Sequence, residues 1–213
     1  MDLRTGEITR AEALVRWIDP EKGMIRWVIF SHLEENGLIE EVDLYLFGKV
    51  CRLINQWKEK YGRKICISVN LSRCAFEYIY FFKDYQKVYA KDPCPKDCIE
   101  FELLESIVLN QVERVKRVVT EIKDFGFSCS LDDFGSGYSS FSVLTNVDLS
   151  TLKIDRSLFM NENDTREQII IRNILKTAQA LHMKSVAEGV ETRGYVDFLE
   201  GTWLRLCAGL CIL

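Results

Sequence analysis

The sequence predicts an α/β protein whose parallel strands form a (β/α)8 barrel. Segments with the period-two apolar pattern of strands alternate along the 213 residues with segments of helical apolar spacing. Three strand segments also carry polar side chains opposite their aliphatic face, as Glu100 and Glu102 do. An open sheet covered by helices would bury these groups against apolar surfaces, whereas a barrel can direct them toward its axis and its wet mouth.

Six strands are predicted along the chain, in the order that a barrel requires. They are residues 8–17, 65–71, 99–104, 127–133, 149–154 and 184–188. Four helices are marked by apolar side chains three or four positions apart. These are Leu46, Val50, Leu53 and Trp57; Tyr78, Phe82, Tyr85 and Tyr89; Val112, Val115, Val119 and Ile122; and Ile170, Ile174, Ala178 and Leu181. Gly126 is predicted to end the third of these helices, and further helices are predicted at 139–144 and from Gly194.

Composition and charge exclude several classes of protein. The 28 basic and 32 acidic residues give a net charge of −4, which argues against binding a nucleic-acid polymer through bulk positive charge. No apolar run approaches the ~20 residues of a membrane-spanning helix, and no apolar leader follows Met1. We therefore expect a cytoplasmic protein whose eight cysteines are reduced thiols. The spacing of Cys94 with Cys98, and of Cys207 with Cys211, leaves zinc as the alternative.

Polar residues end five of the six predicted strands, and one, Glu12, lies within the first. They are Glu12, Asn70, Glu102, the pair Asp132 and Asp133, Lys153, and Glu188. In a barrel these strand ends meet at one mouth, which is where barrel active sites lie. Converging carboxylates repel one another without a cation, and ligands that are all oxygen suit Mg²⁺ or Mn²⁺. Two such ions sharing an aspartate are suited to in-line attack on a phosphodiester.

Six ordered motifs carry a resemblance to a known family. They are EALVRW at 12–17, SVNLS at 68–72, ELLES at 102–106, DDFGSGYSS at 132–140, LKIDR at 152–156 and AEGVET at 187–192. Together they are similar to the signature of the EAL family of bacterial cyclic di-GMP phosphodiesterases. The resemblance implies a modified (β/α)8 barrel that hydrolyses cyclic di-GMP to linear pGpG with two Mg²⁺ or Mn²⁺ ions, while Ca²⁺ is expected to inhibit. A homodimer is a further expectation, as are motility and biofilm formation as the processes controlled.

The resemblance also implies a role for each matching residue. Glu12, Asn70, Glu102 and Asp132 would bind one ion, and Asp132, Asp133 and Glu188 the second. Lys153 would hold or polarise the attacking water, with Glu188 as a candidate base. Arg16 would grip a phosphate and Asp155 would support the substrate at the same mouth. Glu105 and Glu191 would support the neighbouring loops, although an acid at a helix start, such as Glu105, is also favoured by the helix dipole.

The ends of the chain depart from the family pattern. We expect a catalytic domain over residues 1–201 that lacks the family's first strand, and an apolar tail of different pattern over residues 202–213. The barrel is therefore expected to be incomplete, with its first strand and its closing region missing or altered. Three functions stay open: an active phosphodiesterase, a non-catalytic cyclic di-GMP receptor, and a protein-interaction module or inactive fragment. Retention of Lys153 and Glu188 favours the first, because a receptor has no need of either.

Overall fold

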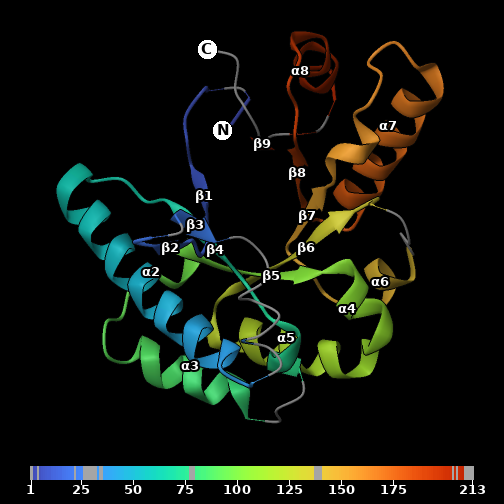
Figure 1. The fold of residues 1–213 in the computed structure, drawn as a ribbon. Helices are drawn as coiled ribbons and strands as arrows, with labels where there is room; N and C mark the ends of the chain where they lie inside the picture. The colour runs from blue at the N-terminus through green and yellow to red at the C-terminus, as the bar shows by residue number, and fades with distance from the viewer. Residues whose placement is uncertain are drawn as a thin grey trace.

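The fold is built on one parallel sheet that curls around a central space (Figure 1). The computed structural model describes residues 2–3, 5–21, 23–25, 33, 36–76, 80–136, 141–202, 204 and 206–208. In these residues seven strands pair in parallel in the order β1-β4-β5-β6-β7-β8-β9. Their bounds are β1 Arg10–Ala13, β4 Cys66–Asn70, β5 Ile99–Leu104, β6 Ser128–Phe134, β7 Thr151–Ile154, β8 Lys184–Glu188 and β9 Leu206–Ala208.

Helices connect the strands and cover the outer face of the sheet (Figure 1). They are α2 Ile39–Tyr61, α3 Phe81–Tyr89, α4 Glu105–Asn110, α5 Val112–Phe125, α6 Phe141–Asn146, α7 Thr165–Ala180 and α8 Arg193–Glu200. Short 3-10 turns lie at η1 Arg73–Phe76, η2 Lys96–Cys98 and η3 Arg156–Leu158. A separate antiparallel hairpin, β2 Trp17–Asp19 and β3 Gly23–Ile25, follows β1. None of the described helices is long and apolar enough to cross a membrane.

The core lies between the outer face of the sheet and the helices. Ile67 and Val69 of β4 are buried there, as the alternation of the strand requires. Aromatic rings fill the space under α2 and α3: Phe47 packs 5.0 Å from Tyr85 and 5.6 Å from Phe101 between ring centroids. Because these groups occupy the outer face, the alternate residues of each strand are left to line the interior of the curl.

Most predicted elements are present, with differences at their ends. The strands at 99–104 and 184–188 have the predicted bounds, and Gly126 ends α5 in the left-handed conformation with φ of 104°. The prediction of one strand over residues 8–17 is wrong, because the chain forms β1 and then turns into the hairpin strand β2. Parts of the predicted helices, Tyr78 and residues 139–140, lie outside the described residues.

Two further predictions need correction. The sequence pattern predicts six strands, whereas the sheet contains a seventh, β9, within the apolar tail, where Ala208 pairs in register with Glu188. The apolar stripe of α7 is only partly the predicted one. Ile174 and Ala178 are buried as predicted, but Ile170 is half exposed and the buried face is completed by Ile171 and Leu175. Consecutive apolar positions in this helix allow either stripe, and packing against the sheet selects one.

Candidate functional site

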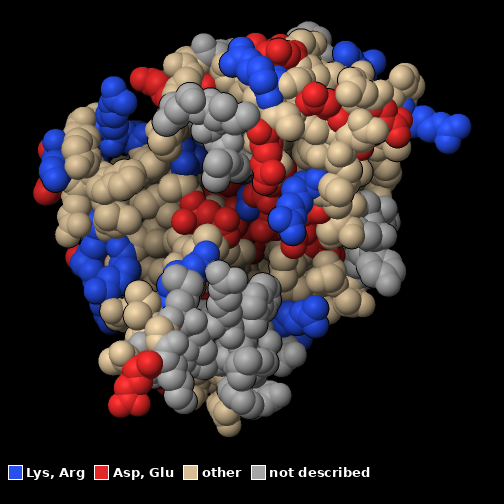
Figure 2. Space-filling view, turned by 45° about the horizontal axis from the view of Figure 1, so that its top comes forward, with Lys and Arg blue, Asp and Glu red and all other residues tan. Residues whose placement is uncertain are grey.

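The carboxyl ends of the parallel strands bring an acidic cluster to one mouth of the curled sheet. Glu12 lies in β1, Asn70 ends β4, Glu102 lies in β5, Asp132 in β6, Lys153 in β7, and Glu188 ends β8. Figure 2 shows acidic side chains gathered in a central hollow of the surface. The residues predicted to converge therefore do share one end of the sheet, which is the result expected for parallel strands that all run in the same direction.

Lys153 is the centre of this cluster. Its Nζ lies 2.8 Å from Oε1 of Glu102, 2.9 Å from Oδ1 of Asp132 and 2.9 Å from Oε1 of Glu188. The lysine is buried, and so are Glu102 and Asp132. An ammonium held by three carboxylates from three other strands is fixed in place more firmly than a surface ion pair, which has little effect on stability.

Burial and charge act in opposite directions on the groups around Lys153. Burial disfavours the charged ammonium, but Glu102, Asp132 and Glu188 outweigh that effect and raise the pKa of Lys153 above its ordinary value. Burial raises the pKa of Glu102 to about 8 despite the neighbouring lysine, and Asp132 and Glu12 add to this rise. Burial also raises the pKa of Glu188. In both carboxyls the effect of burial therefore outweighs that of the neighbouring ammonium.

Three carboxylates form a group with the spacing of a cation site. Oxygens of Asp132, Asp133 and Glu188 all lie within 4.8 Å of one another. Asp133 reaches this position through a left-handed backbone with φ of 57°, which is rare for a residue other than glycine and is a feature of functional sites. Its backbone N–H donates to Oδ1 of Asp132 over 3.0 Å. Burial, then the charges of Asp132 and Asp155, raise the pKa of Asp133.

The site fits a hard divalent cation in two respects. Its donors are carboxylate and amide oxygens, the ligands that Mg²⁺ and Mn²⁺ prefer. Oε2 of Glu102 is also buried and has no hydrogen-bond partner among the described residues. A buried carboxylate oxygen without a donor is costly, and a bound cation would remove that cost.

The other end of the cluster is more open. Glu12 is exposed, and its Oε1 accepts a hydrogen bond of 2.7 Å from Nδ2 of Asn70. These two residues come from β1 and β4, the first two strands in the order of the sheet.

The remaining predicted residues surround the cluster at different depths. Arg16 is exposed beyond β1, and its Nη1 donates to the carbonyl of Val15 over 3.0 Å. Oδ1 of Asp155 accepts the N–H of Ser157 over 3.0 Å and so caps η3. Glu105 is buried at the first position of α4, whereas Glu191 is exposed beyond β8. The structure thus buries Glu105 at the start of α4 and leaves Arg16 and Glu191 exposed.

The loops beside the cluster pack closely through two glycines. A Cβ on Gly135 would lie 2.4 Å from Cδ1 of Leu158, and a Cβ on Gly189 would lie 2.5 Å from Cβ of Arg156. Both glycines have positive φ, 103° and 63°. The segment that contains η3 is therefore pressed against the residues that directly follow β6 and β8.

The sequence interpretation missed the residues directly beneath the cluster. Glu100 was predicted on the inner face of its strand, but its partners Arg10 and Thr151 were not identified. Arg10 forms an ion pair with Glu100, and Oγ1 of Thr151 donates to Oε1 of Glu100 over 2.7 Å. The period-two alternation contained the signal, because each of the three stands two residues before a predicted site residue.

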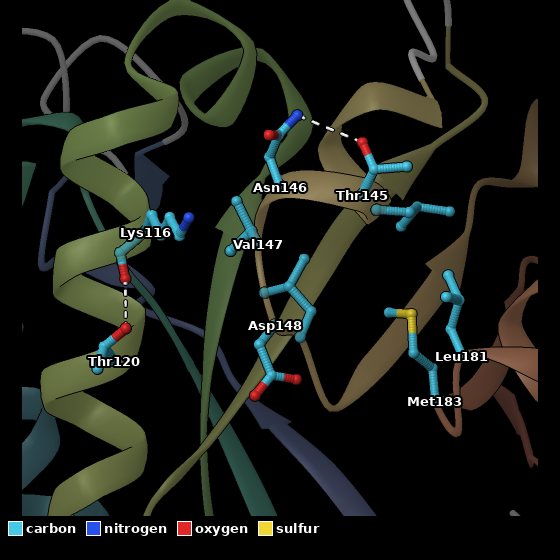
Figure 3. Close-up of a pocket in the computed structure, with 10 residues that line it drawn as sticks. Lys116, Thr120, Thr145, Asn146, Val147, Asp148, Leu181 and Met183 are labelled. Atoms are coloured by element: carbon cyan, nitrogen blue, oxygen red, sulfur yellow. Dashed lines mark hydrogen bonds between the residues drawn. The ribbon is translucent and has the colours of Figure 1, made fainter.

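Two pockets of the described chain are lined by residues outside the acidic cluster. One of about 370 Å³ lies where β7 and β8 begin, at the opposite end of the sheet, between α5 and the ends of α6 and α7 (Figure 3). Its polar groups are occupied locally: Oγ1 of Thr120 donates to the carbonyl of Lys116, and Asn146 donates to Thr145. The second, of about 460 Å³, is apolar and lies between the end of β6 and α7.

The cysteines of the described chain do not form a metal centre. Cys51, Cys66, Cys94, Cys98 and Cys129 are free thiols. In the described residues, Asp132, Asp133 and Glu188 are the group of three potential ligands close enough to hold an ion, and no cysteine belongs to it. Cys211 of the second predicted zinc pair lies outside the described residues.

Known proteins are similar to this chain in sequence and in fold. The EAL domain model matches residues 1–213. The chain is 30% identical over 209 residues to "Cyclic di-GMP phosphodiesterase NbdA" of Pseudomonas aeruginosa, covering 97% of the chain and 27% of that protein. It is 34% identical over 200 residues to "Cyclic di-GMP phosphodiesterase PdeR" of Escherichia coli, covering 91% and 30%. The chain thus spans less than a third of the length of these curated relatives.

Solved structures agree with the sequence comparison. "PaMucR Phosphodiesterase, c-di-GMP complex" superposes with a TM-score of 0.86 at 29% identity, covering 96% of the chain and 83% of that structure. "Crystal structure of FimX EAL domain from Pseudomonas aeruginosa bound to c-di-GMP" superposes with a TM-score of 0.87 at 18% identity over 98% of the chain and 84% of that structure, a likeness of fold alone. With the family model matched over its whole length, the chain belongs to the EAL domain family.

Proposed function

We propose that the chain hydrolyses cyclic di-GMP to linear pGpG with divalent cations, and so lowers a second messenger that controls motility and biofilm formation. The carboxylate cluster around Lys153 is the observation that carries this proposal. The names of the relatives support the substrate, since two of them are called cyclic di-GMP phosphodiesterases. The similar solved structure of the PaMucR phosphodiesterase, a complex with c-di-GMP, supports it as well.

The donor set supports two Mg²⁺ or Mn²⁺ ions. We assign one ion to Glu12, Asn70, Glu102 and Asp132, and the second to Asp132, Asp133 and Glu188. Such a pair of ions, when bound, supplies charge stabilisation for the phosphodiester and lowers the pKa of a bound water. The close oxygens of Asp132, Asp133 and Glu188 support this assignment, as does the unpartnered oxygen of Glu102.

The protein groups around the ions have separate tasks in this proposal. Lys153 orients the attacking water and offsets negative charge as it develops on the phosphate oxygens. Glu188, in contact with Lys153, accepts the proton of that water. Arg16 at the rim binds a phosphate of the substrate, for which its fork is suited. Asp155 supports the substrate at the same mouth, and Glu105 and Glu191 support the loops.

A hydrolysis assay tests the proposal directly. The purified chain is incubated with cyclic di-GMP and Mn²⁺ or Mg²⁺, and the products are separated and identified by mass. We expect linear pGpG, and we expect EDTA or Ca²⁺ to stop its formation. Lys153→Met should reduce turnover by ~10²-fold or more, the range for removing a group that stabilises charge developing in the transition state. Lys176→Met on the exposed side of α7 is the matched control and should retain wild-type turnover.

Binding measurements separate the alternatives. Cyclic di-GMP bound in Ca²⁺ without turnover in Mn²⁺ would contradict the enzyme proposal and support a receptor. If the chain neither binds cyclic di-GMP nor hydrolyses it, the remaining alternatives are an interaction module and an inactive fragment. Sedimentation of the same sample tests the homodimer that we propose as the assembled state.

A further inference from the structure

A buried ion pair crosses the interior of the curled sheet beneath the acidic cluster. Arg10 of β1 contacts Glu100 of β5, although β4 lies between these two strands in the sheet. The side chain of Glu100 is 3% exposed and that of Arg10 is 18% exposed. Thr151 of β7 donates to the second oxygen of Glu100 over 2.7 Å. Both oxygens of this buried carboxylate therefore have partners from other strands.

Stability alone is a poor explanation for this pair. Transferring two charges out of water carries a desolvation cost that their attraction often fails to exceed, and apolar replacements of similar volume are frequently as stable. The interiors of (β/α)8 barrels are usually filled by branched aliphatic side chains. Here Ser68, Ser130 and Thr151 line the same interior, so the ion pair lies in a layer that is mostly polar, to which β8 contributes the apolar Val186.

The layer stands in register with the site above it. Each of its members precedes a site residue by two positions on the same strand, and therefore points to the same face. The pairs are Arg10 with Glu12, Ser68 with Asn70, Glu100 with Glu102, Ser130 with Asp132, and Thr151 with Lys153. The lower layer and the site are therefore carried by the same short strands, two residues apart.

The position of strand β1 depends most on the ion pair between Arg10 and Glu100. Within the described residues, β1 pairs with β4 and with no second strand, over the four positions from Arg10 to Ala13. Glu12 is exposed and is held by one hydrogen bond from Asn70. The contact of Arg10 with Glu100 ties β1 to the strand beyond its neighbour, which no ladder hydrogen bond of β1 does.

We propose that Arg10 is a positioning residue of the site, whose ion pair with Glu100 anchors β1 and so holds Glu12 in place to bind a divalent cation. The inference rests on the metal site proposed above and deepens it. Arg10 touches neither substrate nor cation in this proposal. It fixes the position of β1, and β1 carries Glu12.

A neutral double variant separates positioning from folding. Arg10→Met alone leaves the charge of Glu100 buried without its partner, so it should lower the thermal midpoint of the protein. Adding Glu100→Gln removes that charge and keeps an acceptor for Thr151, so the double variant should recover most of the lost midpoint. Arg10→Lys keeps a cation near Glu100, and Arg52→Met removes an exposed ion pair with Asp92 as the matched control.

The readout is the Mn²⁺ concentration that half-saturates the thermal shift of each variant, with turnover measured in parallel. We expect the double variant to need at least ~10-fold more Mn²⁺ than the wild type, a difference of ~1.4 kcal/mol in binding free energy. Arg10→Lys should restore the wild-type value, and Arg52→Met should not change it. A stable double variant with wild-type Mn²⁺ dependence would overturn the proposal, and so would a double variant without a cooperative melt, because the pair would then serve folding.

This design distinguishes the inference from the proposed function. A wild-type chain that binds Mn²⁺ but releases no pGpG contradicts the enzyme proposal and leaves the Mn²⁺ comparison of variants intact. A wild-type melt that does not respond to Mn²⁺ contradicts both the metal site and the role of Arg10.

Discussion

At the scale of single residues, Glu102 shows how the site balances charge. Burial raises the pKa of this carboxyl to about 8, so it keeps its proton near neutral pH when no cation is bound. A carboxyl whose pKa is higher in the folded chain than in the unfolded chain stabilises the fold below its unfolded pKa, near 4.5. That stabilisation is lost as pH rises through about 8. A divalent cation would take the place of the proton on Glu102, so binding of the cation would release that proton.

This balance predicts a pH dependence that Glu102→Gln removes. In EDTA, the thermal midpoint of the wild type should fall relative to that of the variant between pH 6 and pH 9, because the amide stays neutral throughout. Each 1 kcal/mol changes the midpoint by ~2–4 °C in a chain of this size, so the effect is measurable by calorimetry. Mn²⁺ should reduce the fall in the wild type. Parallel midpoints of the two proteins from pH 6 to pH 9 would contradict the raised pKa.

Gly189, directly after Glu188, tests how tightly the mouth is packed. Gly189 and Gly62 have nearly the same backbone conformation, with φ of 63° and 64°. A Cβ added to Gly189 would lie 2.5 Å from Cβ of Arg156. A Cβ added to Gly62 would have nothing within 4 Å. Gly62→Ala should therefore cost the ~1–2 kcal/mol of a left-handed alanine, and Gly189→Ala a further ~1–3 kcal/mol from overpacking.

Urea denaturation of both variants measures these costs, and turnover of the same samples measures the effect on Glu188. We expect Gly189→Ala to lose activity and Gly62→Ala to retain it. Equal losses of free energy in the two variants would mean that Arg156 moves aside at no cost.

At the scale of elements, the chain shows which features local sequence specifies. The strand at residues 99–104 and the end of α5 at Gly126 follow from alternation and from glycine's access to positive φ, which are local properties. Strand β9 is three residues long, and its identity depends on pairing with β8 rather than on its own pattern. The pairing of Arg10 with Glu100 likewise depends on a curl that brings strands 90 positions apart together.

Helix α7 gives a prediction at this scale. Oδ1 of Asp164 accepts the N–H groups of Arg166 over 2.8 Å and of Glu167 over 3.4 Å, and so caps the helix start. Asp164→Ala should lower the free energy of unfolding by ~1 kcal/mol, the typical cost of a lost cap. Asp164→Asn keeps the acceptor and should change it by only a few tenths. Denaturant unfolding at equilibrium compares the two. An asparagine variant as unstable as the alanine variant would show that charge, not capping, matters at this position.

At the scale of the whole molecule, site and scaffold differ in how far they could be predicted. The residues of the cluster were found because each lies in or near the carboxyl-terminal half of a strand, and parallel strands bring these halves together whatever the details of packing. The contacts within the cluster, above all the three carboxylates on Lys153, depend on how strongly the sheet curls. That curvature is a property of seven strands and the helices around them, and no single segment encodes it.

The described sheet begins at β1 and ends at β9. Ligand binding is the sharpest test of whether its strands are held together in solution. The site draws on six strands, from β1 to β8, and a ligand that bridges them stabilises the whole sheet at once. With cyclic di-GMP at about 100 times its Kd in Ca²⁺, linkage predicts ~2.7 kcal/mol of added stability, or a rise of ~5–11 °C in the thermal midpoint. GMP at the same concentration is the control, since it cannot span the site. A cooperative melt that rises with cyclic di-GMP and not with GMP would establish that the strands hold the mouth together in solution. A melt without a cooperative transition, or one indifferent to the dinucleotide, would mean that the strand ends converge too loosely to bind it.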